Sequence, residues 1–391
     1  MGYYTEYLDR NLNVLQLNAE RKTQLKRISE LRGGRDVLVY AADFDKPNTP
    51  AQLLMITYED LLPISDQLSN LHGTKLDLIL ETGGGSGEVA EDIVRLLRDK
   101  YDDVGVIVPG WAKSAGTLVA MAADEILMEP ASALGPIDAQ LSWQGKVFSA
   151  DALIEGMEKI KKEVETTGVL NRAYIPMLQA LSPGELQSAQ NALNFSKTLV
   201  TEWLARYKFK TWAQHSSTGK DVTPAEKRQR AEEIAMELCN HRRWLTHGRS
   251  IKITDFEQMR LKITDYSQQP QLAEAIRRYH TLLQIMFSST NIYKVFETAQ
   301  SQIYRFVSVA VAPPQTGQQP DVAFIELQCS SCKTQSKIQA NLAKAPIQPG
   351  ALRFPADNKF KCPGCGAEID LSDARRQIEV QSKKPLVDEY A

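Results

Sequence analysis

The chain contains 391 residues, of which 43% are hydrophobic and 24% charged, and its formal net charge is -2. This length exceeds one average domain and suits two or three folded units of a soluble, globular protein. The near balance of charge argues against a protein that binds nucleic acid or a membrane surface along its whole length.

No segment of the sequence is expected to enter a membrane. The N-terminus lacks the basic stretch and apolar run of a secretory signal. The most apolar region, residues 104–128, is interrupted by Lys113, Asp124 and Glu125 and does not make a spanning helix. The five cysteines are Cys239 and two CxxC pairs, an odd set that favours metal ligation in a reducing compartment. We therefore expect a cytoplasmic protein.

Helical and strand-like segments alternate in the first part of the chain. Leucines at helical spacing predict a surface helix over residues 5–32, ended by Gly33 and Gly34. Further patterns predict strands at 37–42, 76–81 and 104–109, and helices at 58–71, 87–101 and 114–125. Short apolar strands that alternate with helices indicate an α/β fold with a parallel sheet covered on both faces.

Beyond about residue 150 the sequence is mainly helical. Helical patterns cover residues 155–167, 181–207, 224–241 and 271–300, and the second of them opens with Ser182 as a cap before Pro183. Residues 312–320 have the composition of a linker. We therefore divide the chain into an N-terminal helix (1–34), an α/β domain (35–275), a helix with linker (276–320) and a cysteine-bearing module with a tail (321–391).

Three glycines, Gly83 to Gly85, separate a predicted buried strand from the following helix. A phosphate loop is excluded because no Lys-Ser/Thr pair follows the second glycine. A dinucleotide site fits only formally, because the next strand ends in Pro109 and Gly110 rather than in an acid that could hold a ribose. Two interpretations stay open: a turn that serves packing, and an oxyanion site formed by adjacent glycine amides.

Ser114 stands where the next strand gives way to a helix of small residues. A serine in this position is most often a helix cap. The small neighbours Ala115, Gly116 and Thr117 keep the approach to its hydroxyl open. Ser114 is therefore a candidate nucleophile, and the Ala115 amide is a candidate second oxyanion donor.

These segments resemble the serine dehydrogenase proteinase family, a branch of the Clp protease, signal peptide peptidase A and crotonase superfamily. The residues that carry the resemblance are TGGGSGEVAEDI (82–93), VPGWAKSAGTLVAMAADEI (108–126), LGPIDAQ (134–140) and WLTHGRSI (244–251). The resemblance implies a Clp/crotonase-like core of spiral ββα units in which Ser114 attacks a carbonyl. Amides of Gly84 or Gly85, together with Ala115, would hold the oxyanion. The chain departs from the family pattern at Gly83, usually a proline, and at Lys113, commonly an apolar residue.

The sequence does not identify the base that would activate Ser114. Clp-type relatives use a histidine after the serine, in a region where this chain has GPIDAQ. Signal-peptide-peptidase-type relatives use a lysine from the next helical region, where the candidates are Lys159, Lys161, Lys162 and Lys197. The first three of these lysines also fit a solvated helix face. His247 is the other candidate base, unless it only anchors a loop, and Asp138 either orients a base or caps a turn.

Two CxxC pairs predict a zinc ribbon at the C-terminal end. Cys329 and Cys332 are separated from Cys362 and Cys365 by the 29 residues Lys333 to Lys361. Two such turns can place four thiolates on one structural zinc ion. We expect the insert between them to form the ribbon's hairpin. Cys239 is expected to be an ordinary helix residue rather than a nucleophile.

The insert contains six basic residues, Lys333, Lys337, Lys344, Arg353, Lys359 and Lys361. They permit nucleic-acid binding, but few aromatic residues accompany them, so we favour recognition of a substrate or partner protein. The leading hypothesis is a cytosolic serine peptidase acting on protein or peptide substrates, expected by analogy to form a homo-oligomer. The alternatives are an inactive Clp-like scaffold, a crotonase-type acyl-CoA enzyme and, less favoured, a nucleic-acid-binding protein.

Overall fold

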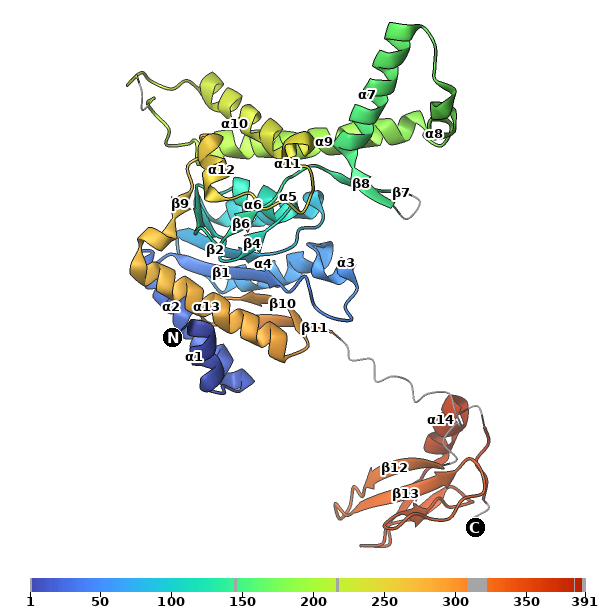
Figure 1. Ribbon diagram of the computed structural model, residues 1–391. Coiled ribbons are helices and arrows are strands. Elements are labelled where there is room, and N and C mark those ends of the chain that lie inside the picture. Colours follow the sequence, from blue (N-terminus) through green and yellow to red (C-terminus); the bar gives the residue numbers. More distant parts are fainter. Residues whose placement is uncertain (1, 144–145, 216–217, 308–321, 383, 389–391) are drawn as a thin grey trace. The chain divides into compact units, whose positions relative to one another are not determined.

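A seven-stranded sheet in the order β11-β10-β1-β2-β3-β5-β9 forms the centre of one unit of the structure (Figure 1). Its strands are β1 (Asp36–Ala42), β2 (Lys75–Glu81), β3 (Asp103–Ile107), β5 (Glu125–Met128), β9 (Thr264–Asp265), β10 (Ile292–Glu297) and β11 (Gln302–Phe306). Neighbours from β1 to β9 are parallel, whereas β10 and β11 add an antiparallel edge beside β1. The sheet is therefore mixed, not entirely parallel as the sequence indicated.

The structure is a computed structural model that describes residues 2–143, 146–215, 218–307, 322–382 and 384–388. It divides into two compact units, Met1–Ser308 and Val309–Ala391. The linker predicted at residues 312–320 lies outside the described residues. Among the described helices, none is both long enough and apolar enough to cross a bilayer.

The side chains of β1 alternate between two cores, one on each face of the sheet. Leu38 and Tyr40 lie in the core formed with α4, α5 and α6, whereas Val37, Val39 and Ala41 lie in the core formed with α2 and α13. These helices are α2 (Val14–Leu31), α4 (Leu61–Ser69), α5 (Gly87–Lys100), α6 (Ala115–Met121) and α13 (Pro270–Ser289). Burial of each valine or leucine contributes about 1.5–3 kcal/mol. The predicted covering of both faces is present.

Two predicted helices differ from the structure. The helix expected over residues 271–300 ends at Ser289, and residues 292–297 form β10 instead. The run IYKVFE is β-branched and aromatic, and it pairs with β1 over Val39 to Ala42. The helix expected over 5–32 is divided into α1 (Tyr3–Asp9) and α2, because Asn13 and Gln16 form a capping box that begins a second helix.

The short elements between the strands position the loops around Ser114. They are α3 (Ala51–Leu54), η1 (Tyr58–Asp60), β4 (Trp111–Ala112), β6 (Ala133–Leu134) and η4 (Tyr266–Gln268). β4 and β6 pair in parallel, and Leu134 also forms a bridge with Ile251. Segments far apart in the sequence therefore meet beside the turn that carries Ser114.

The segment between β6 and β9 forms a largely helical extension on one side of the sheet, at the top of Figure 1. It consists of β7 (Gln140–Trp143), β8 (Lys146–Ser149), α7 (Ala150–Thr167), η2 (Arg172–Tyr174), α8 (Ile175–Gln179), α9 (Pro183–Trp203), η3 (Leu204–Lys208), α10 (Pro224–Cys239), α11 (His241–Trp244) and α12 (Ile253–Gln258). The expected cap of α9 is present, since Ser182 and Glu185 form a reciprocal capping box ahead of Pro183.

The second unit is a small β structure followed by one helix. Its elements are β12 (Val322–Gln328), β13 (Gln335–Asn341), β14 (Leu352–Arg353), β15 (Lys359–Lys361), β16 (Glu368–Asp370) and α14 (Ser372–Ser382). β12 pairs antiparallel with β13, and β15 pairs antiparallel with β16. Each hairpin therefore spans one CxxC turn, instead of a single hairpin forming within the insert as expected.

Candidate active site and cysteine cluster

Ser114 occupies a strained turn between β4 and α6. Its φ of 50° and ψ of -116° lie outside the backbone regions that residues with a side chain favour. Such strain costs of order 1–3 kcal/mol and persists only where the surroundings enforce it. Here Lys113 N–H donates to the Thr82 carbonyl at 2.9 Å, and the Thr117 hydroxyl donates to the Ala112 carbonyl at 2.9 Å. These bonds hold the turn from both sides.

The Ser114 hydroxyl does not cap α6, although the residue stands at the N-cap position. Within the described part of the chain it has no hydrogen-bond partner. The hydroxyl oxygen of a capping serine accepts a hydrogen bond from a backbone N–H of the first helical turn. The helix-cap interpretation therefore does not account for Ser114, whereas a strained strand-to-helix turn that exposes a hydroxyl is the arrangement of a nucleophile elbow.

The glycine cluster packs against this turn so closely that a side chain would not fit. A Cβ on Gly84 would lie 2.7 Å from the Ser114 Cβ and 2.9 Å from the Lys113 carbonyl oxygen. Gly84 also has a φ of 109°, which non-glycine residues rarely adopt. Glycine at this position is required both by its backbone conformation and by its contact with Ser114.

The backbone amides of Gly85 and Ala115, both near Ser114, have no acceptor within the described residues. The third predicted donor, the Gly84 amide, donates to the Thr82 hydroxyl at 3.1 Å. Ile56 holds the segment Gly83 to Gly85 in place, since its N–H donates to the Gly84 carbonyl at 2.7 Å. Of the two candidate glycines, Gly85 is thus the one whose amide is available to an oxyanion.

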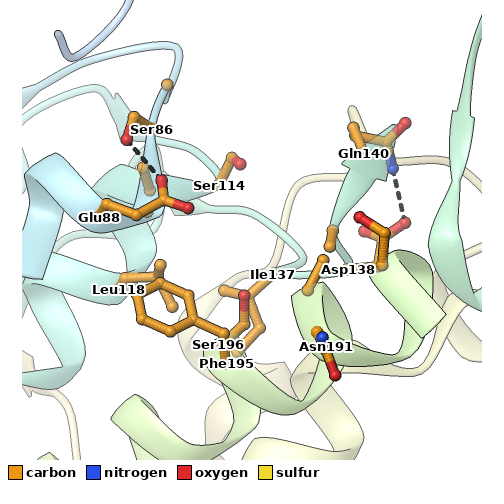
Figure 2. Close-up of a pocket in the computed structure, with 16 residues that line it drawn as sticks. Ser86, Glu88, Ser114, Leu118, Ile137, Asp138, Gln140, Asn191, Phe195 and Ser196 are labelled. Atoms are coloured by element: carbon orange, nitrogen blue, oxygen red, sulfur yellow. Dashed lines mark hydrogen bonds between the residues drawn. The ribbon is translucent and has the colours of Figure 1, made fainter. Parts of the chain in front are cut away.

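A cavity of about 590 Å³ opens beside Ser114 (Figure 2). Gly85, Ser114, Ala115 and Asp138 line it, so the structure brings most of the residues singled out in the sequence to one place. Helix α9 contributes further side chains to the lining, including Phe195. A cavity of this size, with a few convergent polar groups, is typical of a small-ligand or peptide side-chain site.

Asp138 holds His247 by a short contact. The Asp138 Oδ1 atom lies 2.7 Å from His247 Nδ1, and the Asp138 side chain is 1% exposed. Its other oxygen accepts from Gln140 at 2.9 Å and lies 3.3 Å from His241 Nδ1. A buried carboxylate on one ring nitrogen of a histidine fixes the ring orientation and tautomer, which leaves Nε2 for proton transfer. His247 itself does not line the Ser114 cavity.

Lys113, one of the two departures from the family pattern, does not line the Ser114 cavity. Its ammonium donates to the Leu134 and Arg249 carbonyls, at 3.1 Å each, and to the Ser250 hydroxyl at 3.0 Å. Burial, with repulsion from Lys252, lowers its pKa to about 8. Lys113 thus connects the turn of Ser114 to the loop that carries His247.

Three of the four candidate lysine bases, Lys159, Lys161 and Lys197, form ion pairs with glutamates, and none of the four, Lys162 included, lines the cavity. Lys197 forms an ion pair with Glu232 at 3.1 Å and does not line the cavity. On α7, Lys159 pairs with Glu155 at 2.7 Å and its side chain is 72% exposed, as expected for a solvated helix face. Burial raises the pKa of the Cys239 thiol to about 12, which argues against a thiolate nucleophile.

The sequence analysis missed Glu88, whose carboxylate points into the cavity (Figure 2). Glu88 lies in the first turn of α5. An acidic residue there is normally explained by the positive end of the helix, so the sequence held no separate signal for a role in the site.

The four CxxC cysteines converge in the second unit. Their sulfur atoms all lie within 4.8 Å of one another, with Cys329 and Cys365 at 3.7 Å and Cys332 and Cys362 at 3.5 Å. Sulfurs that share a tetrahedral zinc ion with Zn–S bonds of about 2.3 Å are separated by roughly 3.8 Å. The cluster is therefore compatible with a structural zinc ion.

Comparisons with known proteins agree with this geometry. Residues 55–172 match the family of ClpP-like SDH-type serine proteinases. Two uncharacterized proteins of Methanocaldococcus jannaschii are similar, MJ1495 at 35% identity over 88 residues and MJ0137 at 38% over 84 residues. Each match covers 22% of this chain and 30% or 28% of the relative, so it spans less than a third of the relatives' length.

The sequence identity of this chain to solved structures is lower than its identity to these two proteins. The stomatin-specific protease 1510-N is 22% identical with a TM-score of 0.22, covering 29% of this chain and 60% of that chain. ClpP1 from Listeria monocytogenes is 18% identical with a TM-score of 0.21, covering 36% and 77%. A monofunctional enoyl CoA isomerase from M. smegmatis is 15% identical with a TM-score of 0.25, covering 61% and 82%.

The matched segment contains both the glycine cluster and the strained turn of Ser114, and the predicted Clp/crotonase-like fold is confirmed. Residues 55–172 of this chain are thus similar to the family of ClpP-like SDH-type serine proteinases.

Proposed function

We propose that this protein is a serine peptidase that cleaves protein or peptide substrates through an acyl-enzyme on Ser114. The observation that carries the proposal is the Ser114 hydroxyl, held on a strained turn without a partner among the described residues, in a cavity shared with the unpaired amides of Gly85 and Ala115. A nucleophile and two oxyanion donors at one place are the minimum that acyl transfer needs.

In the proposed reaction, the Ser114 Oγ atom bonds to the carbonyl carbon of the scissile peptide, and the carbonyl oxygen becomes an oxyanion held by Gly85 and Ala115. The hydroxyl proton passes to a base and from there to the leaving amine when the C–N bond breaks. Water then releases the acyl group and restores the serine hydroxyl. Donors of this kind commonly contribute about 10²–10³-fold to the rate.

We infer that His247, oriented by Asp138, is the base. The 2.7 Å contact between these two side chains supports this role, whereas the pairing of Lys197 with Glu232 does not support a lysine base. A base must come within hydrogen-bond reach of the hydroxyl proton, and such contacts often tighten only when substrate binds.

The four cysteines would hold one structural zinc ion, and the second unit would recognise a substrate or partner protein. A closed Cys₄ site offers no open position for catalysis, so this ion would act on stability alone. A homo-oligomer and a cytoplasmic location belong to the same proposal, by analogy with the family.

A fluorophosphonate probe tests the proposal. We expect the purified protein to be labelled, and Ser114→Ala to lose the label completely. The matched control is Ser188→Ala, which removes another hydroxyl from the same cavity and should keep the label. Absence of labelling in a folded, metal-loaded sample would favour the inactive scaffold.

One observation favours a second candidate, an acyl-CoA enzyme of the crotonase type. Two carboxylates, Glu88 and Asp138, line the cavity that also holds the unpaired amides. Such an enzyme would use a carboxylate for proton transfer and would not need the serine. Turnover of a CoA thioester that survives in Ser114→Ala would support it over the peptidase.

A further inference from the structure

Glu88 places a carboxylate in the cavity without a cation to balance it. Its Oε2 atom accepts a hydrogen bond from the Ser86 hydroxyl at 2.7 Å, and no cation within the described chain forms an ion pair with it. By contrast, Glu91 on the same helix pairs with Arg95. Because Glu88 is exposed to the cavity, its charge is accessible to a bound molecule (Figure 2).

The other charge in the cavity has the same sign. Asp138 lines the opposite side in Figure 2, where it is held by Gln140 and His247. Among the described residues that line the cavity there is no lysine, arginine or histidine. The site therefore has an acidic lining, and Glu88 is the carboxylate in it that is stabilised only by the Ser86 hydroxyl and the positive end of α5, with no cationic side chain paired to it among the described residues.

Between these two acids, apolar side chains alternate with the polar side chains of Ser196 and Asn191. Leu118, Ile137 and Phe195 contribute the hydrocarbon surface of the lining. Phe195 packs against the start of α5, since a Cβ on Gly87 would lie 3.2 Å from its Cε1 atom. An apolar wall that leads to a carboxylate suits a side chain with a long hydrocarbon stem and a cationic head.

An unbalanced carboxylate also bears on the reaction. Negative charge near Ser114 opposes the negative charge of an oxyanion, because like charges repel, and for a carboxylate as exposed as Glu88 this repulsion is screened by solvent and salt. A cation delivered by the substrate would remove this opposition. An acidic substrate would add to it.

We propose that the Ser114 cavity selects substrates with a lysine or arginine side chain at the residue bound beside the scissile bond, and that Glu88 determines this specificity. The inference rests on the proposed peptidase function, but its central measurement is binding and does not require cleavage.

The experiment uses the full-length Ser114→Ala protein and three fluorescein-labelled alanine hexapeptides that differ at one central residue, which is arginine, glutamine or glutamate. We expect the arginine peptide to bind about fivefold more tightly than the glutamine peptide, the effect of one partly exposed ion pair. The glutamate peptide should bind most weakly. The arginine preference should shrink as salt is raised.

Glu88→Gln in the same background should remove the preference, whereas the matched control Glu91→Gln should retain it. Equal binding of the three peptides, or an arginine preference that survives in Glu88→Gln, would overturn the inference. Cleavage by the protein with Ser114 intact is measured alongside, with and without Glu88→Gln. A loss of turnover that is equal for all three peptides would make Glu88 a reacting group and would also overturn it. Charge-selective binding without any cleavage would support the inference and count against the peptidase function.

Discussion

The Lys113 ammonium donates a hydrogen bond to the Arg249 carbonyl oxygen at 3.1 Å, across 136 residues of sequence. This contact joins the turn that presents Ser114 to the loop that carries His247. Backbone hydrogen bonds between Leu134 and Ile251, at 3.0 and 2.9 Å, support the same junction. Lys113 is therefore a positioning residue in the proposed mechanism.

Removal of the Lys113 hydrogen bonds should lower the turnover rate more than it weakens substrate binding. We expect Lys113→Met to lower kcat about tenfold or more with little change in KM, because a misplaced base affects the transition state and not the bound substrate. Lys113→Arg retains charge and donors and should recover most of the activity. Steady-state kinetics with one peptide substrate provides the measurement, and equal activity of the Met and Arg variants would contradict the role.

The pH dependence of this junction follows from the pKa of Lys113, which is lowered to about 8. The ammonium is charged below that value and loses its charge, and one of its three donors, as pH rises through it. Lys252 is the neighbouring cation that adds to this shift. We expect activity to fall above pH 8 and the fall to move to higher pH in Lys113→Arg. Identical kcat profiles for the two proteins would exclude this explanation.

Gly84 should not tolerate even the smallest side chain. In Gly84→Ala the new Cβ would meet Ser114 at 2.7 Å with the backbone at a φ of 109°, so we expect a stability loss of about 1–3 kcal/mol and loss of probe labelling. The control is Gly156→Ala on α7, where a Cβ meets nothing within 4 Å and should stabilise the helix by ~0.5–1 kcal/mol. Chemical denaturation and labelling measure the two effects, and a fully active Gly84→Ala would refute the packing argument.

Two alanine variants distinguish between the candidate bases His247 and Lys197. His247→Ala should reduce kcat about 10²–10⁴-fold, the usual contribution of general base catalysis. Lys197→Ala, which breaks only the pair with Glu232, should leave kcat unchanged. Asp138→Asn should reduce kcat as well, since an amide no longer enforces the histidine tautomer. The reverse pattern, with activity lost in Lys197→Ala alone, would assign the base to the lysine.

The zinc content of the protein should depend on the four clustered cysteines. We expect one zinc ion per chain by elemental analysis, lost in Cys362→Ser and retained in Cys239→Ser. Loss of the metal should unfold residues 322–388 while Ser114 keeps its probe label, because the serine lies in the other unit. A protein that is fully folded and metal-free would show that the four thiols serve another purpose.

The parts of the structure that the sequence predicted well are those set by local patterns. Alternating residues such as Leu38 and Val39 mark a strand buried on both faces, and Ser182 with Glu185 marks the start of α9. The strand β10 was missed because one of its two pairing partners, β1, lies more than 250 residues away in the sequence, whereas the other, β11, follows it directly. Pairing partners at that distance leave no local pattern.

In the candidate site too, residues in local patterns could be predicted, whereas contacts between distant segments could not. Ser114, Gly85 and Ala115 could be named from one short stretch and a resemblance, whereas the link from Asp138 to His247 spans 109 residues and required the fold. The role of Lys113 could not be predicted from the sequence, because the carbonyls that accept its hydrogen bonds come from two other segments, at Leu134 and Arg249. Gly84 was a candidate donor until its amide was seen to donate to Thr82.

The most direct test of the account is the mass of the acyl-enzyme. The protein is mixed with an activated ester, quenched in acid within the first turnover and analysed intact and after digestion. We predict a single added acyl group on the peptide that contains Ser114, and none in Ser114→Ala. An acyl group on another residue, or turnover with no covalent adduct in the quenched protein, would contradict the proposal that Ser114 is the nucleophile.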